Sequence, residues 1–110
     1  MTSDETTFES LAEAMLQSIF ERVEAAVGDE VEVELEGGVL TIEVEDRGTF
    51  LLNKHAPLRQ LWLSSPVSGA SHYAYEAEHG RWRSTRDGAD LVERLAADLA
   101  TATGGAFSWD

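Results

Sequence analysis

The first 28 residues follow a helical spacing of apolar side chains. The apolar residues recur every three or four positions and so form a stripe, which Leu16 and Phe20 widen. One face of the segment is therefore apolar and the other polar. Thr6 and Glu9 have the spacing of an N-terminal capping box, and Gly28 is placed to end a helix. The spacing therefore predicts an amphipathic helix. The residues that recur every three or four positions are Phe8, Leu11, Met15, Ile19, Val23 and Val27.

The helical spacing then gives way to alternation of polar and apolar residues. Glu30–Glu36 places aliphatic side chains on one face and acids on the other, which is typical of a half-buried strand. Gly37-Gly38 supplies the backbone freedom of a tight turn, and Val39–Val44 alternates in the same way, so the two segments predict a hairpin. Turn signals separate four further predicted strands, Thr49–Asn53, Gln60–Ser64, His72–Ala77 and Arg81–Ser84.

A second helical pattern follows the strands. Leu91, Leu95 and Leu99 share one face of the segment Asp90–Ala102. A helix, about six strands and a helix, without a repeat or a linker, predict a single α+β domain over residues 1–110. We expect a two-layer α/β sandwich, in which an antiparallel sheet carries both helices on one face. The other face of the sheet is then exposed to solvent, so packing in the core would not explain a large apolar side chain on that face.

Charge is distributed unevenly along this chain. Fourteen of the 21 acids lie in the first 46 residues, where Arg22 is the only base, whereas residues 47–110 hold seven acids and seven Lys or Arg. Such a field attracts cations or basic proteins and opposes direct binding of nucleic acid. Because 43% of the residues are hydrophobic, the chain is too apolar for a disordered acidic tail.

Cysteine is absent, which excludes disulfides, thiolate metal sites and cysteine nucleophiles. Residues 1–7 are acidic and polar, unlike a signal or transit peptide, and no apolar run approaches the ~18 residues of a membrane span. We expect no membrane association and a cytoplasmic bacterial protein. The alternative is a mitochondrial matrix protein from which a presequence has been removed.

Segments in the middle of the chain resemble the central signature of the frataxin and CyaY family. They are Gly48–Pro57 (GTFLLNKHAP), Gln60–Pro66 (QLWLSSP), Gly80–Trp82 and Asp87-Gly88. The similarity covers nearly the whole chain, from the acidic first helix through Glu36–Ile42 to the last helix. Where many members carry a basic residue shortly after the Ser-Ser-Pro turn, this chain has His72.

The resemblance implies the frataxin fold and weak binding of Fe²⁺ or Fe³⁺ at an acidic ridge. It also implies docking on the cysteine desulfurase and scaffold protein that build iron–sulfur clusters. Such a protein acts as an iron chaperone or as a regulator of the desulfurase–scaffold complex. It is not an enzyme in the ordinary sense, although weak ferroxidase activity at the ridge fits the family. We expect a monomer, with oligomers on iron loading as the alternative.

The acids themselves form a candidate metal surface. They follow one face of the predicted first helix at intervals of three or four residues, ~5–6 Å apart, and continue along the first strand. Carboxylate oxygens suit hard cations, and the absence of a closed cage implies modest affinity. Leu35 stands where an EF-hand needs glycine, so that loop is excluded. The alternative is a solvated acidic face. The candidate ligands are Glu9, Glu13, Glu21, Glu24, Asp29, Glu30, Glu32 and Glu34.

Trp62 is the candidate docking residue. If Leu61 and Leu63 point to the helices, Trp62 points to the open face. Tryptophan is enriched among binding hot spots, and neighbouring polar residues supply a rim. The alternative is that Trp62 only covers sheet surface. The predicted partner-binding residues are Asn53, Lys54, His55, Gln60 and Trp62.

The remaining candidates favour structural roles. Ser64-Ser65 with His72 lacks a nucleophile elbow, so a hydrolase is not predicted. The histidines fall in separate elements without a ligand spacing, so a histidine metal site is not expected. They are His55, His72 and His79. The aromatic residues expected to pack on the sheet are Tyr73, Tyr75 and Trp82.

Two function classes remain open. The first is an iron-binding accessory protein of cluster assembly, in which the acids hold iron and Trp62 grips a partner. The second is an acidic adaptor or nucleic-acid mimic without a metal role, which needs only net charge and does not need Trp62. An enzyme is the weakest interpretation, because no paired acid–base or nucleophile pattern is apparent.

Overall fold

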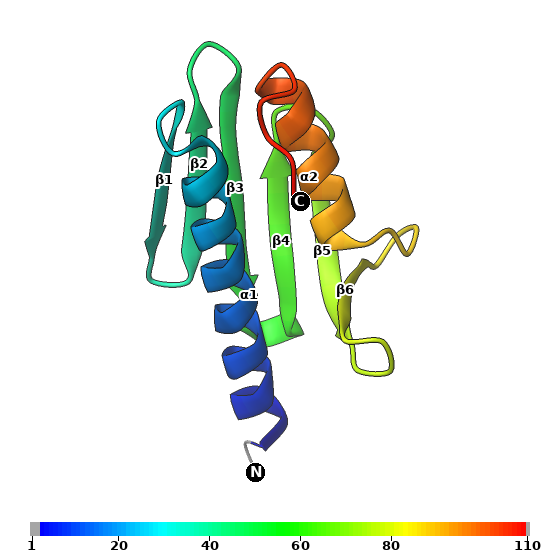
Figure 1. The fold of residues 1–110 in the computed structure, drawn as a ribbon. Helices are drawn as coiled ribbons and strands as arrows, with labels where there is room; N and C mark the ends of the chain where they lie inside the picture. The colour runs from blue at the N-terminus through cyan, green and yellow to red at the C-terminus, as the bar shows by residue number, and fades with distance from the viewer. Residues whose placement is uncertain (1–2, 110) are drawn as a thin grey trace.

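A computed structural model describes residues 3–109 of the chain, with side chains from Thr7 onward. Figure 1 shows two layers, with both helices lying in front of a single sheet. This is the predicted α+β sandwich. None of the described helices has the length and apolarity that a membrane span requires. The elements are α1 (Ser3–Val27), β1 (Val31–Glu36), β2 (Val39–Val44), β3 (Gly48–His55), the 3-10 turn η1 (Ala56–Leu58), β4 (Gln60–Ser65), β5 (Gly69–Glu76), β6 (Arg81–Ser84) and α2 (Leu91–Ala102).

The sheet is an antiparallel meander in which each strand pairs with the next along the chain, from β1 to β6. The β1–β2 turn consists of Gly37 and Gly38, with φ angles of 60° and 79°. Positive φ at both central residues is what a twist-matched two-residue hairpin turn requires, and glycine adopts it without strain. The turn fixes the register, which pairs Glu36 with Val39 and Glu32 with Glu43. The predicted hairpin is confirmed.

The core lies between the sheet and the two helices. Alternate residues of each strand enter it: Leu61 and Leu63 of β4 are buried, as are Tyr73 and Trp82. The buried line of α1 runs slightly off the predicted stripe, because Ala12 and Leu16 are buried whereas Leu11 and Met15 are only partly so. The full buried line of the helix is Phe8, Ala12, Leu16, Ile19, Val23 and Val27.

Three predicted boundaries differ from the structure by two residues or more, and several others differ by one residue. Helix α1 begins at Ser3, so Thr6 lies inside the helix and its assignment as a capping residue is wrong. Strand β5 begins at Gly69 rather than at His72, because its pairing with β4 continues to the end of the hairpin. Strand β3 extends to His55, since the ladder with β4 continues beyond the predicted end at Asn53.

A buried polar group joins α2 to the sheet. Asp98, which is 6% exposed, accepts hydrogen bonds from the hydroxyls of Ser65 at 2.8 Å and Ser68 at 2.5 Å. A buried carboxylate needs such partners to remain charged. The start of α2 is capped by Asp90, whose side chain accepts from the Glu93 amide at 3.1 Å.

Candidate functional site

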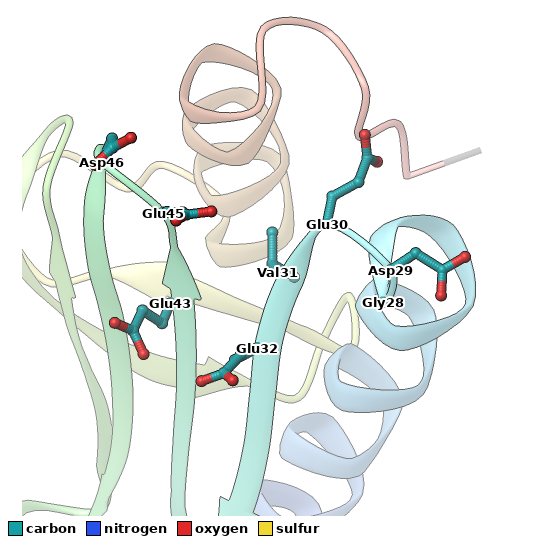
Figure 2. Close-up of a pocket in the computed structure, with 8 residues that line it drawn as sticks. All are labelled: Gly28, Asp29, Glu30, Val31, Glu32, Glu43, Glu45 and Asp46. Atoms are coloured by element: carbon teal, nitrogen blue, oxygen red, sulfur yellow. The ribbon is translucent and has the colours of Figure 1, made fainter.

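Six acidic residues line a hollow where β1 begins and β2 ends, and their side chains point in different directions (Figure 2). The connection from α1 and the strand β1 contribute three of them, and β2 with its following turn contributes the others. The predicted ligands Asp29, Glu30 and Glu32 therefore line the same hollow, although no three of its described carboxylates lie within 4.8 Å of one another. The residues that line the hollow are Gly28, Asp29, Glu30, Val31, Glu32, Glu43, Glu45 and Asp46.

Sequence reasoning missed half of these acids. Glu32 and Glu43 are direct partners in the β1–β2 ladder, and both side chains are exposed on the face of the sheet away from the helices. Like charges placed directly opposite each other destabilise a hairpin, so a bound cation would stabilise this pair. The two-residue turn already implies this register and could have identified Glu43. The positions of Glu45 and Asp46 depend on the conformation of the turn after β2, where Asp46 has a φ of 66°.

The two bases nearest in sequence to these acids, Arg47 and Arg22, form no ion pair with them within the described residues. The guanidinium of Arg22 donates to the backbone oxygen of Trp109 and lies 5.1 Å from the centre of its indole ring. This contact ties α1 to the segment after α2. None of the six acids of the hollow forms an ion pair within the part of the chain that the structure describes. The hollow therefore keeps its negative charge.

Two other predicted ligands lie near the opposite end of α1 and already share one cation, the ammonium of Lys54. The Lys54 ammonium donates to a carboxylate oxygen of Glu9 and, at 3.0 Å, to Oε2 of Glu13. These hydrogen bonds, the one to Glu9 first, raise the pKa of Lys54 above its usual value near 10.5. A cation that bound Glu9 and Glu13 would have to displace this lysine. The predicted ridge is therefore divided into an end that is paired with Lys54 and an end without an ion pair among the described residues.

We expect replacement of Lys54 by methionine to destabilise the fold by about 1 kcal/mol at neutral pH, because Glu9 and Glu13 lose their shared partner. Since the folded pKa of Lys54 is raised, this contribution is fully present below pH 10.5 and is lost as the pH rises through the folded value. Urea unfolding of both proteins at pH 7 and at high pH measures this. The matched control is Arg81→Met, which removes a charge from an exposed position at the start of β6. An equal loss from both variants would contradict the prediction.

The remaining predicted ligands occupy intermediate positions. Glu21 accepts a hydrogen bond from the Gln17 amide at 2.9 Å on the exposed side of α1. Glu24 lies against Gly28, where an added Cβ would meet its Oε1 at 2.3 Å, so its carboxylate adjoins the hollow. Glu34 lies on β1 opposite Thr41. The metal-binding role of all eight predicted ligands stays a prediction.

The second candidate surface is the open face of the sheet, the face opposite the helices. Trp62 is half-buried there, between the buried Leu61 and Leu63, as alternation predicts. Its indole N–H donates to Oε1 of Gln60 at 2.8 Å. The imidazole rings of His55 and His72 stack on its two faces. Their centroids lie 3.9 and 4.3 Å from that of the indole.

Four of the five predicted partner-binding residues share this open face, and Lys54 does not. Lys54 points to α1, whereas Asn53 and His55, its neighbours on β3, point the other way. Sequence reasoning also missed two exposed apolar side chains, Leu51 on β3 and Leu58 on η1, which are 38% and 59% exposed. Because Leu51 shares the face of Asn53 and Lys54 does not, the surface around Trp62 is more apolar, and less basic, than the predicted rim.

One compact group of potential metal ligands lies elsewhere. Among the described residues, Glu76, Glu78 and His79 alone bring three ligand atoms within 4.8 Å of one another. Sequence reasoning gave His79 no ligand spacing, yet its Nδ1 lies 2.8 Å from Oε2 of Glu76. Arg83 donates to the other oxygen of Glu76 at 2.6 Å and, with His79, lowers the pKa of this carboxyl. These contacts explain the group as a surface ion-pair cluster.

The geometry also opposes a serine hydrolase. The Ser65 hydroxyl donates to Asp98 on the helix side of the sheet, whereas His72 stacks on Trp62 on the open side. Since the sheet separates the two side chains, no serine–histidine pair forms between them.

Both candidate surfaces lie on the exterior of a small acidic α/β sandwich, which defines the architectural class of this protein. The model of the frataxin-like domain matches residues 1–105. The chain belongs to the frataxin family.

Curated relatives include bacterial and mitochondrial proteins. The frataxin-like protein of Leishmania donovani mitochondria is 44% identical over 107 residues, which are 91% of this chain and 57% of that protein. The iron–sulfur cluster assembly protein CyaY of Photobacterium profundum is 32% identical over 106 residues, 96% of this chain and 97% of that protein. The chain thus spans little more than half the length of its mitochondrial relatives.

Solved structures agree with the fold. Frataxin from Psychromonas ingrahamii superposes with a TM-score of 0.84 at 27% identity, over 96% of this chain and 97% of that one. Trimeric frataxin from Saccharomyces cerevisiae, complexed with ferrous iron, superposes with a TM-score of 0.70 at 33% identity, over 88% and 85% of the two chains.

Proposed function

We propose that this protein is an iron-binding accessory factor of iron–sulfur cluster assembly, which carries Fe²⁺ or regulates a cysteine desulfurase–scaffold complex. It acts by binding rather than by catalysis. The similarity to the assembly protein CyaY and to a yeast frataxin complexed with ferrous iron supports this proposal.

The observation that carries the proposal is the hollow of six carboxylates at the edge of the sheet. Within the described residues no base forms an ion pair with these acids: Arg22 is held by Trp109, and Arg47 forms no ion pair. Oxygen ligands on an open surface suit hard cations such as Fe²⁺ and let them exchange rapidly with water. Weak binding and rapid exchange fit a protein that delivers or senses iron.

The position of the hollow also fits delivery. Glu32 and Glu43 point to the same face of the sheet as Trp62. A partner that covers Trp62 would therefore approach the side of the molecule on which the iron is held. In this mechanism the iron is cargo, the acids hold it by charge and oxygen ligation, and the open face positions the recipient.

A pair of charge-matched variants tests the proposal. Glu30→Gln/Glu32→Gln removes two acids from the hollow, and we expect it to lower the affinity for Fe²⁺ about tenfold or more, because affinity follows the number of charged ligands. Anaerobic calorimetry with Fe²⁺ measures the affinity. The same variant should weaken the effect of the protein on cluster formation by a reconstituted desulfurase and scaffold.

The control is Glu9→Gln/Glu13→Gln, which removes the same charge at the end of α1 that is paired with Lys54. It should change the Fe²⁺ affinity less than threefold, because Glu9 and Glu13 lie outside the hollow, and the equal net charge of the two variants removes any general field effect from the comparison. Equal losses in both variants would favour an acidic adaptor that works by net charge. An absence of any effect of the unmodified protein on cluster formation would refute the proposed function.

A further inference from the structure

Trp62 lies between two imidazole rings contributed by the strands on either side of it. The ring of His55, on β3, has its centroid 3.9 Å from that of Trp62 at an interplanar angle of 12°. The ring of His72, on β5, lies at 4.3 Å and 16°. Both faces of the indole are therefore covered by nearly parallel rings, and its edge is the part that remains available.

A third contact fixes the indole within its own plane. Its single polar atom, Nε1, donates to Oε1 of Gln60 at 2.8 Å, two residues earlier on β4. His72 is the direct ladder partner of Trp62 on β5, and Asn53 is its partner on β3. The indole nevertheless stacks on His55, which lies diagonally across from it. Such diagonal neighbours are within reach of aromatic side chains.

Stacking, rather than hydrogen bonding, accounts for the position of His55. Its Nδ1 is buried and has no hydrogen-bond partner within the described part of the chain. A buried ring nitrogen without a hydrogen-bond partner destabilises the fold. Hydrogen bonding at Nδ1 therefore does not explain the observed position of the ring. The flat contact with Trp62 is the favourable interaction that the structure records for this ring.

We propose that His55 and His72 are positioning residues, which hold Trp62 in one rotamer before any partner arrives. This inference rests on the proposed function, in which Trp62 is the docking anchor. A large side chain that is free in solution must be immobilised on binding, and that loss of freedom weakens association. With both faces and the polar atom of the indole fixed, Trp62 is already in the orientation that it presents.

Truncation and ring-retaining variants separate this role from a general structural one. His55→Ala and His72→Ala each remove a stacked ring, whereas His55→Phe and His72→Phe keep a flat ring in its place. In the free protein, ¹⁵N relaxation of the Trp62 indole N–H should show an order parameter near 0.85 in the unmodified protein. It should fall towards about 0.6 in the alanine variants and stay high in the phenylalanine variants.

Affinity should follow the same order. We expect each alanine variant to bind a purified cysteine desulfurase–scaffold complex about three- to tenfold more weakly, the effect of immobilising one side chain. The phenylalanine variants should bind within about twofold of the unmodified protein. His79→Ala, in the exposed turn after β5, is the control and should change neither measurement. Thermal unfolding identifies any variant that has lost the fold.

Two results would overturn the inference, and they differ from failure of the docking role. If the indole stays equally ordered in the double variant His55→Ala/His72→Ala, the two rings do not position Trp62. If the indole becomes mobile and affinity is unchanged while Trp62→Ala binds poorly, docking stands and prior positioning of the ring does not contribute to it. If Trp62→Ala itself binds normally, the docking role fails, and the positioning role fails with it.

Discussion

Replacement of Trp82 by alanine should lower the free energy of unfolding by about 3–5 kcal/mol, the range for truncation of a large buried aromatic side chain. Trp82 is 2% exposed and lies between the layers. Its ring meets Phe8 of α1 edge-on at 6.0 Å and Tyr75 of β5 at 5.3 Å. Domains of this size have a free energy of unfolding of about 5–15 kcal/mol, so this loss would remove a large fraction of the stability. Chemical unfolding, followed by circular dichroism, measures the loss.

The chain supplies its own control for this prediction. Trp62→Ala deletes the same atoms from the open face, where the indole is half-buried, and should cost only about 1–2 kcal/mol, chiefly from the lost stacking. Trp82→Phe keeps an aromatic ring in the core and should lie between the two. Equal losses from Trp62→Ala and Trp82→Ala would show that the open face is as important to stability as the core.

Much of this fold could be predicted because one-sided burial leaves a clear pattern in the sequence. The stripe that ends at Val27 marked α1, and strict alternation marked β1 and β2 around Gly37-Gly38. The misplaced elements are those whose ends depend on pairing. Strands β3 and β5 continue past their predicted ends because a neighbouring strand continues the ladder there.

The same limit explains what was missed in the candidate site. Alternation assigns side chains to faces but does not say which strands are neighbours, so Glu43 was not joined to Glu32. The predicted third strand stopped at Asn53, which hid the fact that Lys54 and His55 point to opposite faces. The pairing of Lys54 with α1 and the stack on Trp62 depend on tertiary packing, which a single sequence does not encode locally.

The structure thus relates charge to position more closely than the sequence does. Net charge is concentrated in the first 46 residues, but Lys54 pairs with the acids at one end of α1, which leaves the hollow near Glu30 as the larger group of described acids without an ion pair. That hollow extends to the open face through Glu32 and Glu43. The proposed cargo site and the proposed docking anchor therefore lie on one side of the molecule.

Trp62→Ala should weaken binding to a cysteine desulfurase–scaffold complex by about 2 kcal/mol or more, roughly 30-fold, while the protein remains folded. The reason is that its indole is a large and already ordered side chain at the centre of the open face. Calorimetry at fixed ionic strength measures the affinity, and Val67→Ala, which truncates an exposed side chain of the turn between β4 and β5, is the control.

Salt dependence separates the two function classes in the same experiment. An adaptor that works by net charge should lose affinity steeply as salt rises and should bind equally well with or without Trp62, because screening acts on charges and not on an indole. A partner held by the open face should instead retain the 30-fold difference between Trp62→Ala and the unmodified protein across the salt series. Wild-type affinity in Trp62→Ala at every salt concentration would refute docking through the open face and favour the adaptor.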